Sequence, residues 1–287
     1  MYKIFLKFFL LMFILLAQIT QVSLAAKEET LGTLDLLYIQ GKARMGDKDA
    51  QLRLGEIYLI GNGVDKNENT AFSWMEKSAD QGNVDAQFLL GRMYFEAKGE
   101  NKNYNKAISW YVKAANNGHI EAAYALGLYY DGIWDKKRRK KIKDMDVRQK
   151  FIKWYTISAK QGHADSQYQL AKKYLHGWWG GTGKDDGKVG IEWMISAAEQ
   201  GHKEAISDLA IPGYLPRGEG IKWLKIASNN GDISAQHNLG LEYYAGEYVR
   251  QDNTLSKKWL GISCDNGQRL ACEAYRQLKS AGKFGSN

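Results

Sequence analysis

Three histidines are the residues whose spacing most suggests chemistry. His119, His163 and His202 each follow a glycine directly, and histidine is the commonest metal ligand in proteins. The surrounding sequence repeats, so the three positions are equivalent and lie about one repeat apart, roughly 10 Å by helix packing. Side chains at that spacing do not share one ion. We therefore predict that the histidines serve in turns and helix caps, and that the chain has no metal site.

Other catalytic motifs are absent or broken. The run Gly180–Lys184 is similar to a phosphate-binding loop, but Trp178 stands where its first glycine belongs and Asp185 replaces the required serine or threonine. The sequence also contains no nucleophile elbow, HExxH motif or pair of carboxylates with catalytic spacing. We therefore predict no catalytic residue and no cofactor.

A recurring pair of residues shows how these positions are organised. Each of six tryptophans precedes a glycine by eight residues, and a small residue lies between them, five residues after the tryptophan. The pairs are Trp74 and Gly82, Trp110 and Gly118, Trp154 and Gly162, Trp193 and Gly201, Trp223 and Gly231, and Trp259 and Gly267. An aromatic residue, a small residue and a stopping glycine are typical of a packed helix with a glycine C-cap. Their recurrence predicts an internal repeat.

Each repeat is predicted to contain two helices. Helix A carries small, leucine, small and tyrosine residues at positions 0, 4, 5 and 8, as in Ala86, Leu90, Gly91 and Tyr94, which form one helical stripe. Helix B carries the tryptophan. The units begin near residues 50, 86, 122, 166, 205 and 235, and half-units at 31–46 and 270–281 close the ends. The predicted fold class is all-α, an α/α superhelical solenoid of about six helix pairs over residues 26–287.

Three units depart from this regular length. The third contains a basic stretch at 136–143, and the fourth contains a glycine-rich loop with Trp178 and Trp179. Insertions between paired helices map to loops, so each loop is either solvated or a contact for a partner. In the fifth unit, Pro212 and Pro216 fall where helix A should end. Proline lacks a backbone donor, so this helix is predicted to stop early.

The pattern A-x-x-x-L-G-x-x-Y, a glycine-rich turn and A-x-x-W-x-x-x-A-A-x-x-G resembles the Sel-one-like repeat, a relative of the tetratricopeptide repeat. The stretches 86–94 and 106–115 are very close to it, and the resemblance covers residues 31–281. It implies an α/α superhelix that works as a scaffold, adaptor or chaperone-like binding protein, without catalysis by the repeats. Exported bacterial members are the most similar in layout.

The two cysteines lie on either side of the last repeat turn. Cys264 ends helix B of the sixth unit, Cys272 opens the closing helix, and Gly267 lies between them. An even cysteine count in an exported chain favours a disulfide, and the resemblance to the secreted cysteine-rich branch of the family implies the same pairing. The alternative is two small buried thiols.

The first 25 residues predict export. Lys3 and Lys7 precede an apolar run at 8–17, and Ser23 and Ala25 fit a small-x-small cleavage site. We expect a cleaved signal peptide, a mature chain with no membrane span, and a periplasmic or, alternatively, secreted location. A retained N-terminal anchor is the alternative. The formal charge is +8, and the loss of Lys3 and Lys7 with the signal would leave a mild +6. This charge favours acidic partners or surfaces without indicating nucleic-acid binding; the alternative is a solvated basic surface.

The candidate partner-binding residues follow from analogy with tetratricopeptide-like stacks, in which helix A lines the inner face. Positions 2, 6 and 9 of helix A would then meet the partner. They include Phe88, Arg92, Phe95, Tyr124, Tyr168, Lys172, His237 and Tyr244. Aromatic and basic side chains together suit an acidic protein segment. The alternative is that several of them only pack against neighbouring repeats.

These observations favour an exported, non-enzymatic protein-interaction scaffold that binds a partner in its concave groove. One alternative is a periplasmic immunity protein that neutralises a toxic effector, such as an antibacterial lipase, because exported proteins with these repeats resemble such proteins. The other is a cell-wall or β-lactam hydrolase, which no motif supports.

Overall fold

The structure is a computed structural model of the chain. It describes residues 32–132, 145–175, 186–211, 214–216 and 218–284. Several sequence predictions lie outside these residues: the signal peptide at 1–25, the basic stretch at 136–143, the tryptophans Trp178 and Trp179, and Pro212.

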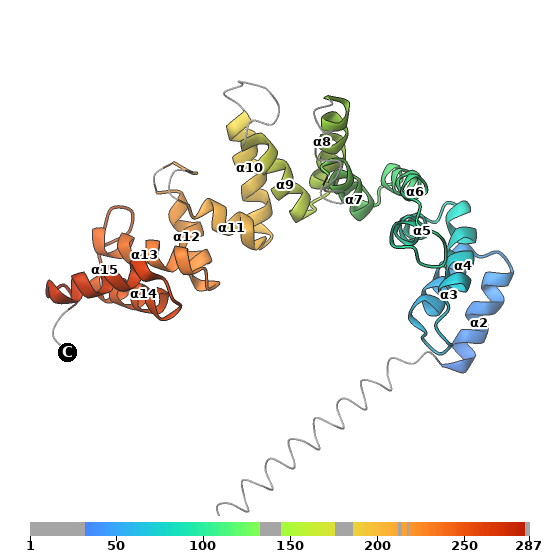
Figure 1. Cartoon of the computed structure of the whole chain (residues 1–287), viewed down its shortest axis with the longest axis horizontal. Coiled ribbons are helices and arrows are strands. Elements are labelled where there is room, and N and C mark those ends of the chain that lie inside the picture. The colour runs from blue at the N-terminus through green and yellow to red at the C-terminus, as the bar shows by residue number, and fades with distance from the viewer. Residues whose placement is uncertain (1–31, 133–144, 176–185, 212–213, 217, 285–287) are drawn as a thin grey trace, which may run out of the picture. The chain divides into compact units, whose positions relative to one another are not determined.

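The described residues form helices and no strands, which confirms the all-α repeat fold (Figure 1). A half-unit helix, α2, comes first, and α15 comes last. Between them, helices A and B alternate along the chain. The bounds are α2 Thr33–Arg44, α3 Lys48–Ile60, α4 Glu68–Asp80, α5 Val84–Glu96, α6 Tyr104–Asn116, α7 Ile120–Tyr130, α8 Met145–Lys160, α9 Ala164–Leu175, α10 Asp186–Glu199, α11 Lys203–Leu209, α12 Gly220–Asn229, α13 Ile233–Ala245, α14 Asn253–Asp265 and α15 Arg269–Ser280.

The chain divides into two compact units, and the division falls within α7, between Leu126 and Gly127. In the first unit, α2 to α5 each pack against the next helix, and α5 packs against α6. In the second unit, the same nearest-neighbour packing runs from α8 through α15. Each helix pair therefore buries its apolar face against its neighbours, as expected of a repeat protein.

The predicted helix-A stripe is buried. In α5, Ala86 and Leu90 are fully buried and Tyr94 nearly so. Gly91 lies against helix B: a Cβ atom added there would stand 2.9 Å from Cδ1 of Tyr111 and 3.1 Å from the carbonyl oxygen of Ala107. The small residue at position 5 therefore permits the close approach of the two helices.

The tryptophan column is not the most buried column of helix B. Trp154 and Trp223 are buried, but the tryptophans of the other four repeats are only half-buried. The residue after each tryptophan is buried in every repeat: Met75, Tyr111, Tyr155, Met194, Leu224 and Leu260. This column fills the space beside the small residue of helix A. It therefore provides the buried packing of helix B that the sequence pattern indicated only through the tryptophans.

Lysine side chains cover part of several tryptophan rings. The Nζ atom of Lys113 lies 3.7 Å from the ring centroid of Trp110, and that of Lys77 lies 4.3 Å from Trp74. Such contacts combine cation–π attraction with packing of the lysine stem. These tryptophans therefore lie between the core and the solvent.

The fifth repeat has a short helix A. The helix α11 has seven residues, whereas α5 and α13 have thirteen each. It ends at Leu209, before the prolines of this segment, as their chemistry predicts.

The N-terminal half-unit leaves apolar side chains in solvent. Leu34, Leu37 and Tyr38 of α2 are 82%, 58% and 67% exposed. They lie three and four residues apart and so share one helix face. Tyr38, which occupies the tryptophan position, therefore does not reproduce the half-buried environment of the tryptophans in the full repeats.

Candidate partner-binding surface

The eight described candidates lie on helix A of four repeats and are all half-buried. In the first compact unit, α5 and α7 carry Phe88, Arg92, Phe95 and Tyr124; in the second, α9 and α13 carry Tyr168, Lys172, His237 and Tyr244. The assignment of these residues to a partner remains a prediction.

The aromatic residues at position 2 contact the next repeat. The Phe88 ring stacks on His119 with centroids 4.3 Å apart, and Tyr168 packs on His202 at 4.5 Å. The Tyr168 hydroxyl donates to Oδ2 of Asp208 at 3.1 Å, and burial, together with Asp208, raises the pKa of Tyr168. The side chains at position 2 therefore pack against the next repeat, which was the alternative to partner binding. Part of each ring still lies at the surface.

The basic candidates carry charge to the surface. The Arg92 side chain is 42% exposed and its Nε lies 4.0 Å from Oε1 of Glu96. Lys172 lies over the Tyr168 ring, with its Nζ 5.1 Å from the centroid. Exposed ion pairs contribute little to stability, so these charges can interact with a partner at small structural cost.

Three further candidates lie on α5 and α13. The Phe95 ring meets Tyr104 edge-on at 5.2 Å, and Nζ of Lys102 lies 5.6 Å from the Phe95 centroid. In α13, burial lowers the pKa of His237. The Tyr244 carbonyl accepts a hydrogen bond from Gln251.

The three repeat histidines cap helices, which confirms the capping role predicted for them. Nδ1 of His119 accepts the backbone N–H of Ala122 at 3.2 Å, and His163 and His202 cap α9 and α11 in the same way. Nε2 of His202 also meets Asp165 of the preceding repeat at 3.1 Å. Within the described residues, no group of three or more histidine, cysteine or acidic side chains is placed to hold a metal ion.

A column of buried glutamines at position 1 of helix A joins the repeats, and the sequence analysis missed it. The side-chain amide of Gln87 donates to the Ala79 carbonyl of the preceding helix B at 3.2 Å. Its Oε1 atom accepts from Asn117, at the end of its own helix B, at 3.2 Å. The equivalent glutamines are Gln51, Gln167 and Gln236. The recurrence of glutamine at one repeat position was the signal that could have revealed them.

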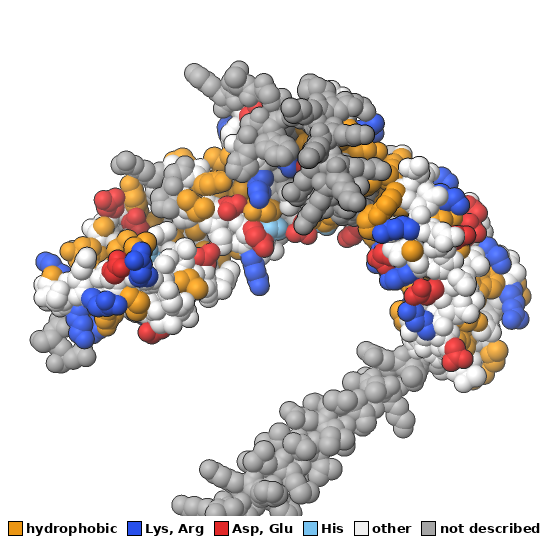
Figure 2. Space-filling view, in the orientation of Figure 1, with side chains coloured by type: hydrophobic (Ala, Val, Ile, Leu, Met, Phe, Trp, Pro, Cys, Tyr) orange, Lys and Arg blue, Asp and Glu red, His pale blue; other side chains and the backbone are white. Residues whose placement is uncertain are grey.

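Acidic and basic side chains are interspersed over the described residues on the face drawn in Figure 2. This mixed pattern agrees with the modest net charge, and the described residues on that face form no large surface of one sign.

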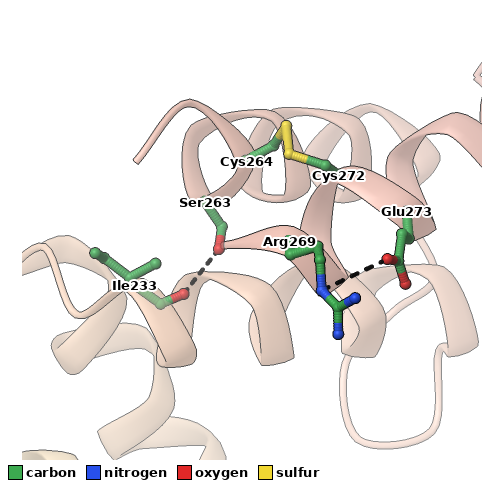
Figure 3. Close-up of a disulfide and its surroundings, with 6 residues drawn as sticks. All are labelled: Ile233, Ser263, Cys264, Arg269, Cys272 and Glu273. Carbon is green, nitrogen blue, oxygen red and sulfur yellow. Dashed lines mark hydrogen bonds and ion pairs between the residues drawn. A yellow bond between two sulfur atoms is a disulfide. The ribbon is translucent and has the colours of Figure 1, made fainter. Parts of the chain in front are cut away.

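The cysteines form a disulfide. Cys264 at the end of α14 bonds to Cys272 in α15, with Cα atoms 4.6 Å apart (Figure 3). Next to it, the Ser263 hydroxyl donates to the Ile233 carbonyl at 2.8 Å, and Arg269 pairs with Glu273 at 3.8 Å. The disulfide ties the final helix to the last full repeat.

Comparison with protein families identifies these repeats. The Sel1 repeat model matches residues 48–83, 84–119, 120–141, 150–163, 164–202, 217–232 and 233–268, well over half of the chain. The chain belongs to the Sel1 repeat family. The fifth Sel1 repeat is matched only over its second half, which agrees with its short α11. No curated protein sequence matches the chain.

Solved Sel1 repeat structures are similar. The chain is 28% identical to the protective antigen c5321 of uropathogenic Escherichia coli strains, with a TM-score of 0.68, covering 88% of this chain and 53% of that one. It therefore spans about half the length of that relative. It is also 28% identical to a Sel1 repeat protein from Oxalobacter formigenes, with a TM-score of 0.59 and coverage of 86% and 71%.

A third match, the immunity protein Pa5087 from Pseudomonas aeruginosa, is 16% identical with a TM-score of 0.37, covering 76% of this chain and 81% of that one. At this level the likeness carries no functional argument.

Sel1 repeat proteins generally mediate protein–protein interactions, and this supports protein partners for this chain. In the part of the chain that the structure describes, no helix has the length and apolar character needed to cross a membrane.

Proposed function

We propose that this Sel1 repeat protein is a non-enzymatic scaffold that acts outside the cytoplasm and binds an acidic protein segment on the helix-A faces of its repeats. The observation that carries the proposal is that helix A of the second repeat and helix A of the fourth repeat carry a half-exposed aromatic and a half-exposed basic side chain at the same two positions. Phe88 and Arg92 share one face of α5, and Tyr168 and Lys172 share one face of α9.

The physical role of each residue type differs. The rings of Phe88 and Tyr168 are already held by the histidine caps, so binding costs little additional side-chain entropy. The Arg92 and Lys172 charges would attract acidic groups and fix their register. We include Tyr124 and His237, at position 2, and Phe95 and Tyr244, at position 9, in the proposed surface because these positions are expected to lie on the same side of helix A.

Three features support a location outside the cytoplasm. Structural disulfides persist mainly in oxidising compartments, and the Cys264–Cys272 bond is part of the structure. The similar Escherichia coli protein is a protective antigen. The signal-like sequence at 1–25 is the third support, and we propose a periplasmic location.

The test is to capture a partner from periplasmic extract with the purified protein, identify it by mass spectrometry, and measure its affinity for a double variant, Arg92→Glu with Lys172→Glu. We expect at least a tenfold loss of affinity and a weaker dependence of the association rate on salt. Charge reversal is preferred to truncation of Tyr168, because the latter also breaks the bond to Asp208.

The matched control is Arg53→Glu with Lys222→Glu, which changes the net charge equally. Both control residues are exposed and paired with a glutamate, Glu56 and Glu199 respectively, but neither occupies a candidate position. Equal losses in the two double variants would show non-specific attraction and would overturn the assignment of the surface. Turnover of peptidoglycan, β-lactams or esters by the purified protein would overturn the non-enzymatic role.

A further inference from the structure

The short helix of the fifth repeat leaves a cavity of about 610 Å³ within the second compact unit. Its apolar walls include Ile211, Leu215, Ile221 and Leu224, from the end of α11 to the first turns of α12. In the second repeat, the last turns of helix A place Met93 and Tyr94 in the core, with 1% and 3% exposure. Helix A of the fifth repeat, α11, ends at Leu209, before the turns that would correspond to Met93 and Tyr94. No helix A therefore fills this space.

Two glutamates face the same cavity from the sixth repeat. Glu242 lies in the last turn of α13, and Glu247 follows the glycine that ends this helix. The backbone N–H of Tyr248 donates to the Glu242 carboxylate. The second oxygen, Oε2, is buried and has no hydrogen-bond partner among the described residues. Burial, and then the charge of Glu247, raise the pKa of Glu242.

The equivalent position in other repeats shows that this glutamate is unusual. Position 7 of helix A is the buried apolar Ile57 in the first repeat and Met93 in the second. In the fourth repeat it is Lys173, also buried, whose ammonium group pairs with Asp131 at 2.6 Å. A charge at this position is therefore compensated in the fourth repeat, whereas Glu242 lies beside a second acidic group.

We propose that this cavity is a second binding site, and that it takes a lysine or arginine side chain from a protein partner. The cation would occupy the space between Glu242 and Glu247, and its alkyl stem would lie along the apolar wall. Long basic side chains combine these two features. A charge-assisted hydrogen bond would also satisfy the buried Oε2 atom, whose desolvation is otherwise uncompensated.

Two described basic residues near this site border a different cavity. Lys225 and Arg250 line a space of about 600 Å³ together with Asp252. Tyr248 borders both spaces. Among the described residues, no lysine or arginine lines the cavity of Glu242, so no described side chain of this chain supplies a cation to the acidic wall.

The test uses two tripeptides that differ in one charge: acetyl-Leu-Arg-Leu-amide and its citrulline counterpart. Citrulline keeps the shape of arginine but is neutral. We expect the purified protein to bind the arginine peptide at least tenfold more tightly, measured by the fluorescence of the tryptophans or by calorimetry. Glu242→Gln should remove this preference.

The matched control is Glu219→Gln, the same chemical change at an exposed residue of the same segment that does not line the cavity. It should leave the peptide preference unchanged. If both peptides bind equally, or if Glu219→Gln has the effect of Glu242→Gln, the proposed site is wrong.

The free protein offers a second measurement. Because the Glu242 oxygen lacks a partner, Glu242→Gln should raise the unfolding midpoint while it removes the preference for the cation. A lower midpoint would mean that the carboxylate already has an internal partner, and this would overturn the proposal. The residues tested here are separate from Arg92 and Lys172, so failure of this site and failure of the proposed helix-A surface are distinguishable.

Discussion

The second and fifth repeats share the helix-A and helix-B sequence pattern but differ in the length of helix A and in how completely their cores are filled. In the second repeat, α5 and α6 are both complete, and the buried positions are filled by apolar residues or by a glutamine with partners on both sides. In the fifth, α11 stops after seven residues, Ile206 stands where the glutamine would be, and a cavity lies beside α12. A repeat can therefore keep its place in the array while one of its helices is too short to fill its share of the core.

The difference follows from how repeat proteins are stabilised. Each repeat contacts only its neighbours, so a local loss of packing is not transmitted along the array. The fifth repeat keeps Ala205 and Leu209 fully buried, and Trp223 remains buried as well. The first turns of its helix A are thus sufficient for contact with the adjacent repeats, and the missing turns create space for a ligand.

The largest expected effect is the loss of the buried residue that follows the tryptophan. Tyr111→Ala should destabilise the protein by about 3–5 kcal/mol, because a fully packed aromatic side chain is replaced by a cavity. Leu224→Ala, the equivalent change in the fifth repeat, should cost about 2 kcal/mol, since this side chain already borders a cavity. Urea unfolding followed by circular dichroism measures both. Equal losses would mean that the two repeats are packed equally well.

The next comparison concerns a glycine in α5 of the second repeat and a glycine in α12 of the fifth repeat. Gly91→Ala should cost about 1–3 kcal/mol, because the new methyl group would meet the Tyr111 ring at 2.9 Å and the neighbouring backbone must shift. Gly220→Ala in the fifth repeat places the methyl 3.6 Å from the Leu209 carbonyl oxygen, an ordinary contact. This change should stabilise the protein by about 0.5 kcal/mol through the unfolded chain. A lower thermal unfolding midpoint for Gly91→Ala and a higher one for Gly220→Ala would support the comparison. Changes in the same direction would contradict it.

A third comparison exchanges residues at position 1. Gln87→Ile should cost about 1–2 kcal/mol, because the carbonyl of Ala79 and the side chain of Asn117 lose their partner. The reverse change, Ile206→Gln, should cost less. By repeat register its amide would have the Ala198 carbonyl as a partner. Chemical denaturation of the two single variants tests this asymmetry; a larger loss for Ile206→Gln would show that the glutamine column depends on a complete helix A.

The helical repeat could be predicted from the sequence because each signal recurs. Position 5 must be small wherever helices A and B approach closely, and six copies make that requirement visible. The residues after the tryptophans were missed because methionine, tyrosine and leucine share only their burial. No single residue type marks that column, although the space beside Gly91 requires a side chain of this size.

The candidate surface was harder to predict for a different reason. The identities of Phe88 and Tyr168 show an aromatic column, but only the structure shows that each ring packs on the histidine cap of the next repeat. Glu242 was missed because one charged residue in one repeat carries no periodic signal. Its environment depends on where α11 ends, and that is a property of the neighbouring repeat.

The smallest expected effect concerns the histidine cap that follows the second repeat. Burial holds the pKa of His119 below its usual value of about 6.5, although Glu121 and Asp85 act in the opposite direction. The unfolded chain therefore binds the proton more readily than the folded one, and this contribution to stability is present above about pH 6.5 and is lost as the pH falls. Protonation also removes the Nδ1 lone pair that accepts the Ala122 N–H.

The variant His119→Asn isolates this contribution, because asparagine caps α5 at the equivalent position through Asn83 and does not titrate. The urea midpoint of the asparagine variant, taken relative to that of the unchanged protein, should be higher at pH 5.5 than at pH 7.5. Differences between the proteins cancel the titration of the other histidines. A difference that does not change with pH would show that the cap at His119 does not depend on a neutral imidazole, and the histidine and asparagine caps of the regular repeats would then be physically equivalent.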